Sequence, residues 1–254
     1  MILYFSGTGN SLDVARRLAA ALTDECVSML SPDVSIDGCE RVVWVFPVHS
    51  WGVPPVVLDA IGRLCRGANT GLHHMVATCG DDAGLTDRQW REAVEACGCP
   101  TGCAFTVEMP NTYIDLPGFD VDSPQVRDAK LAALPARISA VAASITDGDC
   151  HIDVVRGAMP WLKSKVVYPW FMRHAIRPGA FRSIDACVGC GQCASVCPVG
   201  NVSVVGRRPV WGNDCTGCLA CYHICPCGAV THGPFSRGKG RYVNPALREK
   251  SCGK

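Results

Sequence analysis

Eight cysteines near the end of the chain form two copies of one pattern, C-x2-C-x2-C-x3-C-P. The copies are Cys187, Cys190, Cys193 and Cys197 before Pro198, and Cys215, Cys218, Cys221 and Cys225 before Pro226. Three thiolates separated by two residues each can surround three irons of one cubane, and the fourth ligand must come from elsewhere in the chain. The spacing therefore predicts two 4Fe–4S clusters and one-electron chemistry.

The cluster ligands follow from the rule that, in two-cluster ferredoxins, the last cysteine of each run binds the other cluster. We assign Cys187, Cys190, Cys193 and Cys225 to cluster 1, and Cys215, Cys218, Cys221 and Cys197 to cluster 2. The alternative is a pair of structural zinc sites, which typically use two CxxC pairs far apart in sequence and fit these runs poorly. The region resembles bacterial two-cluster ferredoxins, and residues 199–202 and 227–230 match the segments that follow each Cys-Pro there.

A second chemical signal is the loop Ser6, Gly7, Thr8, Gly9, Asn10, Ser11, which follows an apolar run and precedes a helical pattern. A helix N-terminus offers free N–H groups and a positive dipole end, which suit a phosphate. Leu12 stands at the third glycine position of a Rossmann fingerprint, and the lysine of a Walker loop is absent. The loop instead resembles the phosphate loop of flavodoxins, S/T-x-T-G-N-S/T, and this resemblance implies FMN held by neutral donors.

Two further loops are expected beside this one, because ligands bind at the carboxyl ends of parallel strands. Their candidate flavin contacts are Pro47, Val48, His49, Ser50, Trp51 and Gly52 in one loop, and Thr78, Cys79, Gly80 and Asp81 in the other. We expect Trp51 to stack on the flavin ring, with ordinary packing as the alternative. His49 is either a flavin contact or a plain polar residue, and Asn111 to Tyr113 either close over the ring or pack on the sheet.

Strand and helix patterns alternate through the first part of the chain. Apolar strands are expected near residues 1–5, 41–46, 72–78 and 101–109, and helices near 54–65, 85–97 and 124–145. This alternation predicts an α/β doubly wound parallel sheet, flavodoxin-like with order 2-1-3-4-5, followed by a small α+β ferredoxin-like domain. We expect an FMN-binding domain over residues 1–149, a connector over 150–182 and a two-cluster domain over 183–254.

Both signals together resemble the fused flavodoxin–ferredoxin proteins of anaerobic bacteria, the EFR1-type ferredoxin family, over nearly the whole chain. The resemblance implies electron transfer between an external redox protein, two 4Fe–4S clusters and FMN, with conversion between one- and two-electron flow. The alternative function is a flavin-dependent reductase of a small acceptor, such as a quinone, a nitro compound or chelated iron. No acid–base pair or nucleophile stands out, so we assign no catalytic residue, and a zinc scaffold without redox activity is the third possibility.

The connector is basic and aromatic. Residues 151–182 contain six Lys or Arg against one Asp, with Trp161, Tyr168, Trp170, Phe171 and Phe181 interleaved. A helix is expected near residues 161–176. We expect the aromatic side chains to pack on both domains and the charges to be exposed; a docking patch for an acidic electron-transfer partner and a nucleic-acid surface are the alternatives.

Bulk properties narrow the remaining choices. A net charge of +1 indicates no general attraction to nucleic acid. Neither a long apolar run nor a secretory signal pattern is present, which predicts a cytoplasmic protein without a membrane span. Most of the cysteines outside the two runs are expected to be small buried hydrophobes in a reducing, anaerobic cytoplasm, with a third metal site at Cys97, Cys99 and Cys103 as the alternative. The oligomeric state is left open.

Overall fold

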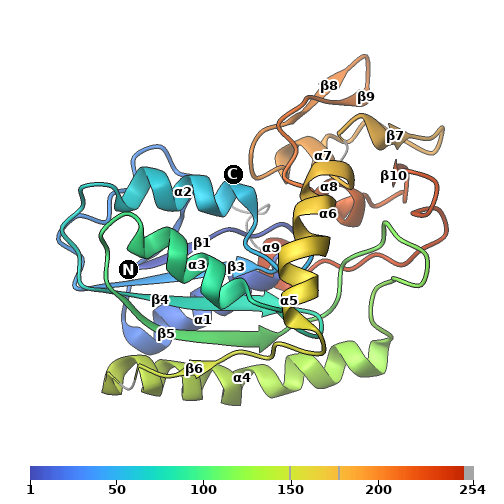
Figure 1. Cartoon of the computed structure of the whole chain (residues 1–254). Coiled ribbons are helices and arrows are strands. Elements are labelled where there is room, and N and C mark those ends of the chain that lie inside the picture. Colours follow the sequence, from blue (N-terminus) through green and yellow to red (C-terminus); the bar gives the residue numbers. More distant parts are fainter. Residues whose placement is uncertain (149, 177, 249–254) are drawn as a thin grey trace.

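The computed structural model describes residues 1–148, 150–176 and 178–248, and its largest unit is a six-stranded sheet (Figure 1). The order is β2-β1-β3-β4-β5-β6, and all neighbouring strands run parallel. The strands are β1 (Ile2–Tyr4), β2 (Cys26–Ser28), β3 (Arg41–Pro47), β4 (Leu72–Cys79), β5 (Thr101–Glu108) and β6 (Ile152–Asp153). The central strands are almost continuous apolar runs, as burial on both faces requires.

Helices cover both faces of the sheet and create two cores (Figure 1). On one face, α1 (Asn10–Leu22) and α4 (Pro124–Asp147) bury Leu12, Leu18 and Ile138. On the other, α2 (Pro55–Cys65) and α3 (Thr86–Glu95) pack around Trp44 and Trp90. Apolar residues at helical spacing supply each stripe, so burial of these stripes fixes the layers.

The predicted order 2-1-3-4-5 is confirmed, and it is the order of flavodoxin-like sheets. The sequence does not predict the two edge strands. β2 has three half-buried residues, and β6 has two exposed residues. Segments this short show no alternation of apolar and polar residues, so their pairing is set by the neighbouring strand.

The C-terminal part, called the cluster module here, comprises β7 (Phe181–Ser183) to α9 (Pro245–Arg248). β7 pairs antiparallel with β10 (Val230–His232), and β8 (Val202–Val205) pairs antiparallel with β9 (Arg208–Trp211). Two short helices, α7 (Gln192–Ser195) and α8 (Ala220–Ile224), each carry a cysteine of one run. The predicted small α+β domain is therefore confirmed.

The cluster module lies against the carboxyl edge of the sheet (Figure 1). Lys239 Nζ donates to the carbonyls of Ile114, Leu116 and Phe119 at 2.6–2.7 Å. The Asn244 backbone N–H donates to the carbonyl of Thr8 at 2.9 Å. These bonds hold the long 110–123 loop and the loop after β1 against the module.

The connector contains one helical segment, called the connector helix, which spans residues 160–174. It consists of α5 (Pro160–Leu162), a π-helical turn η1 (Lys163–Val167) and α6 (Tyr168–His174), and a 3-10 turn η2 (Pro178–Ala180) follows. The predicted helix is thus present. The expectation that its aromatics are covered is wrong in part, because Trp161 is 64% exposed and Trp170 is 56% exposed. Tyr168 is buried and Phe171 is half-buried.

None of the helices among the described residues is both long enough and apolar enough to cross a bilayer.

Candidate redox site

The loop after β1 presents donors that carry no charge. Gly9, the N-cap of α1, has φ 98°, a conformation that glycine adopts without strain, and no side chain caps the helix. The first N–H groups of this 13-residue helix thus lack a side-chain acceptor. Ser11 Oγ lies 2.7 Å from Thr78 Oγ1, and Asn10 Nδ2 donates to the Pro110 carbonyl at 2.9 Å. This set of unpaired N–H groups and hydroxyls fits a phosphate.

The loop lines an open cavity, called the loop cavity, with about 780 Å³ of empty space when the adjoining solvent is included. Its wall is formed by residues 6–8, 10–11, 47–50, 78–80, 109–113 and 217–219 and by Phe171. The three predicted loops therefore come together at the carboxyl edge of the sheet. Gly9 and Gly52 are not in this wall; a Cβ on Gly52 would lie 2.3 Å from the Tyr168 ring.

A second, aromatic compartment adjoins the loop cavity and shares part of its wall. Trp51, Tyr113, Phe119, Trp170 and Phe171 line it, together with the carboxyl groups of Asp81 and Asp82. Its wall is mostly apolar and aromatic, and Trp51 and Asp81 lie here rather than in the loop cavity. No local pattern placed Phe119 or Trp170 beside these residues, because both come from distant segments.

The turn at Trp51 contacts the connector helix through both its backbone and its side chain. Ser50 and Trp51 have φ values of 47° and 65°, which L-residues rarely adopt. Ser164 Oγ donates to the Trp51 carbonyl at 2.7 Å, and Lys163 Nζ lies 5.1 Å from the Trp51 ring centroid. The same ammonium pairs with Asp82 at 2.6 Å. These contacts offset the strain of the turn and fix the indole.

Two titratable groups in the cavity wall are neutral near pH 7. Burial lowers the pKa of His49 to about 4, so the imidazole carries no charge. Burial, followed by the charge of Glu108, raises the pKa of the Cys79 thiol to about 12. A neutral imidazole can still donate or accept a hydrogen bond, whereas a protonated thiol is a poor nucleophile.

The cysteines of the two runs gather in two places. Cys187, Cys190, Cys193 and Cys225 line one small apolar cavity, and Cys227 lies in the same wall. Burial raises the pKa of the Cys215, Cys218 and Cys221 thiols, and a charge on Cys197 would raise it further, which places these four residues near one another. The assignment of ligands to two clusters stays a prediction. No disulfide joins any of the cysteines that the structure describes.

The sulfurs of the two runs are not gathered closely enough to surround single zinc ions. Four thiolates around one zinc, with Zn–S near 2.3 Å, would be about 3.8 Å apart. Among the described residues, just one set of at least three metal-ligand atoms lies within 4.8 Å, and it contains none of these eight cysteines. The zinc alternative therefore fits this structure poorly.

Backbone N–H groups point at the crossing sulfurs in both halves of the module. Asn201 N donates to Cys197 Sγ and Ala229 N to Cys225 Sγ, each at 3.2 Å. Trp211 Nε1 adds a bond to Cys221 Sγ at 3.5 Å. Such bonds stabilise the reduced, more negative cluster and raise its potential.

The two cluster sites differ in their surroundings. Cys218 of cluster 2 lines the loop cavity, and a Cβ on Gly7 would lie 2.8 Å from Cys218 Cβ. Cys190 of cluster 1 is exposed and lines neither the loop cavity nor the aromatic compartment. The sequence predicts both ligand sets, but it does not reveal which one faces the loop after β1.

Similar proteins are found for each of the two parts of the chain. The family model described as a 4Fe-4S dicluster domain matches residues 180–226. The two-electron reduced flavodoxin of Megasphaera elsdenii is 21% identical, with 53% of this chain and 97% of that chain covered and a TM-score of 0.34. A Streptococcus pneumonia flavodoxin is 15% identical, with 55% of this chain and 97% of that chain covered and a TM-score of 0.34. The azoreductase AzrA is 12% identical, with 56% of this chain and 99% of that chain covered and a TM-score of 0.37. No curated protein sequence matches the chain.

The chain thus consists of an N-terminal flavodoxin-like domain and a C-terminal 4Fe–4S dicluster domain. This combination suggests electron transfer.

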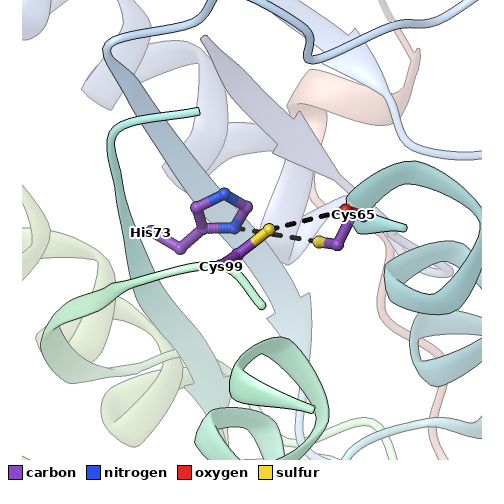
Figure 2. Close-up of side chains that lie close together, drawn as sticks. All are labelled: Cys65, His73 and Cys99. Atoms are coloured by element: carbon purple, nitrogen blue, oxygen red, sulfur yellow. Dashed lines mark hydrogen bonds between the residues drawn. The ribbon is translucent and has the colours of Figure 1, made fainter. Parts of the chain in front are cut away.

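The alternative third metal site at Cys97, Cys99 and Cys103 is wrong, because Cys99 and Cys103 belong to the cores on opposite faces of the sheet. Cys99 instead lies beside Cys65 and His73 (Figure 2). Trp44 Nε1 donates to His73 Nδ1 at 3.0 Å, and His73 Nε2 lies 2.8 Å from Thr70 Oγ1. Because an indole N–H can only donate, the Nδ1 lone pair is already engaged. The trio is a hydrogen-bonded part of the core rather than a prepared metal site.

Proposed function

We propose that the protein transfers electrons between an external redox partner, its two 4Fe–4S clusters and FMN, and so converts between one- and two-electron flow. One observation carries this proposal: Cys218 of cluster 2 and the loop after β1 line the same cavity. Electron tunnelling needs short distances between centres, and this arrangement leaves no intervening domain.

The chain's own residues account for flavin binding. The N–H groups of α1 and the hydroxyls of Ser6, Thr8 and Ser11 would hold the phosphate. The aromatic compartment beside Trp51 would take the ring, and neutral His49 would line the adjoining loop cavity without adding charge. FMN supplies the capacity to accept one or two electrons.

Cluster 2 is the cluster that would exchange electrons with FMN directly, because its ligand Cys218 lines the loop cavity. Cluster 1, whose ligand Cys190 is exposed, would exchange electrons with cluster 2. The protein's contribution is distance and electrostatics, because no acid–base pair is needed.

The test is an anaerobic reconstitution followed by chemical reduction. The loaded protein should contain about eight irons and one FMN per chain. Reduction of the clusters should be followed by bleaching of the flavin. Clusters that reduce fully while bound FMN stays oxidised would contradict the proposal.

A second candidate function is a flavin-dependent reductase of a small planar acceptor. The aromatic compartment favours it, because its walls include exposed Phe119 and Trp170, so a bound ring could be reached from solvent. Turnover of a quinone, nitro compound or chelated iron should then exceed that with free FMN. Equal rates would exclude this function for the acceptor tested.

A further inference from the structure

The outer face of the connector helix is apolar and basic. Trp161, Leu162, Val166 and Trp170 are large apolar residues with 42–64% exposure. Lys165 and Arg173 are exposed among them. We call these six residues the connector face. Monomeric proteins rarely leave so many large apolar side chains uncovered on one short helix, so a partner is expected here.

Charge on this face has one sign. The sequence contains no Asp or Glu from residue 154 to residue 184. Two other cations of the connector are neutralised, since Arg156 pairs with Asp87 at 2.5 Å and Lys163 with Asp82 at 2.6 Å. The residual field of Lys165 and Arg173 thus attracts an anionic surface.

The inner side of the same helix reaches both redox regions. Phe171 lines the loop cavity together with Cys218. A Cβ on Gly217, in the loop of cluster 2, would lie 3.0 Å from Ile176 just beyond the helix. Tyr168 Oη donates to the Val53 carbonyl at 2.5 Å, which anchors the helix to the sheet. Trp170 belongs both to the connector face and to the wall of the aromatic compartment, so a molecule on this face would lie close to these centres.

We infer that the connector face is the docking surface for an acidic redox protein, an inference that rests on the proposed function. Lys165 and Arg173 lie among the apolar residues rather than on a separate polar face. An interfacial membrane helix segregates its cations from its apolar side. Aromatic residues and arginine mixed in one patch are instead typical of protein interfaces.

The experiment measures equilibrium binding of an oxidised, strongly acidic two-cluster ferredoxin to the cofactor-loaded protein. Lys165→Glu with Arg173→Glu should raise Kd at least about tenfold at low ionic strength and remove most of its salt dependence. Trp161→Ser with Val166→Ser, two exposed residues outside both cavities, should weaken binding similarly but retain the salt dependence. The matched control is Arg207→Glu with Arg237→Glu, two exposed arginines of the cluster module, which should change Kd less than about twofold.

Four results would overturn the inference. The control pair could weaken the complex as much as the connector pair, or the parent protein could fail to bind this probe. The apolar pair, Trp161→Ser with Val166→Ser, could abolish binding to vesicles rich in phosphatidylserine without affecting the probe, or it could convert a dimer to a monomer without affecting the probe. Binding is measured without electron flow, so a failed relay in the reduction assay remains distinguishable from failed docking.

Discussion

The sheet and the cluster module differ in what fills their interiors. The sheet buries two continuous apolar cores, which include Trp44, Trp90 and Phe105. The core of the module is small, and cluster ligands such as Cys193 and Cys221 are among its buried members. We therefore expect burial of apolar side chains to be sufficient to stabilise the flavodoxin-like part, whereas the folded module should require its bound clusters.

Removing the clusters should have the largest effect and should be confined to one region. Anaerobic iron chelation should abolish the slow hydrogen exchange of β7 to β10, because the thiols that replace the cubanes leave the core unfilled. Amides of β3 and β4 should stay protected, which serves as the internal control. Equal loss of protection in both regions would show that they form one cooperative unit.

A cavity in the core of the sheet should destabilise the sheet and leave the cluster module unchanged. Leu18 is fully buried in α1, and Leu18→Ala keeps a good helix former while removing packing atoms. We expect a loss of about 3–5 kcal/mol in the unfolding free energy of the sheet. At denaturant concentrations that unfold the sheet of the variant but not that of the parent, the fluorescence of the sheet should differ between the two proteins. The visible absorbance of the clusters should persist in both proteins at these concentrations. A change below about 1 kcal/mol would contradict the rigid packing inferred for this face.

Acid should weaken the sheet through two buried histidines. Burial lowers the pKa of His73 and of His74 to about 4, with a further contribution from a neighbouring positive charge in each case. The unfolded chain binds these protons near pH 6.5, so stability should fall as pH drops from about 6.5 to 4, by on the order of 1 kcal/mol per pH unit for each histidine. Denaturant titrations across this range measure the slope. His74→Gln should reduce it, and an unchanged slope would argue against a neutral buried imidazole.

The contact between the two regions should be sensitive to one methyl group. In Gly7→Ala the new Cβ would lie 2.8 Å from Cys218 Cβ and from the Cys218 carbonyl oxygen. Overpacking of this kind costs about 1–3 kcal/mol, and we expect it as weaker FMN binding and slower flavin reduction. The matched control is Gly62→Ala in α2, where no atom lies within 4 Å. Parent-like FMN affinity in Gly7→Ala would mean that the two regions can separate at no cost.

Local patterns predicted much of this molecule. The cysteine spacing predicted two sets of cluster ligands. The pattern of a strand, a Gly-rich loop and a helix predicted the edge of the sheet at which the loop cavity lies. These features depend on residues close together in the chain, or on a rule for parallel strands. Long-range neighbours were not predictable, because no local pattern brings Gly7 to Cys218 or Phe171 into the cavity wall.

The connector shows the same limit in another way. The sequence predicted the connector helix, but it did not predict which of the aromatic side chains would be buried. Tyr168 is buried because its hydroxyl meets the Val53 carbonyl, whereas Trp170, two residues later, faces outward. Cysteine proximity in sequence was equally misleading, because Cys99 and Cys103 lie on opposite faces of the sheet.

Rapid-mixing reduction of the loaded protein by a reductant that reacts with the clusters tests the central claim most directly. If cluster 2 passes electrons to FMN across the Cys218 contact, flavin bleaching should follow cluster bleaching with a rate independent of protein concentration. A rate proportional to protein concentration would show that electrons reach the flavin between molecules, and it would contradict the path within one chain.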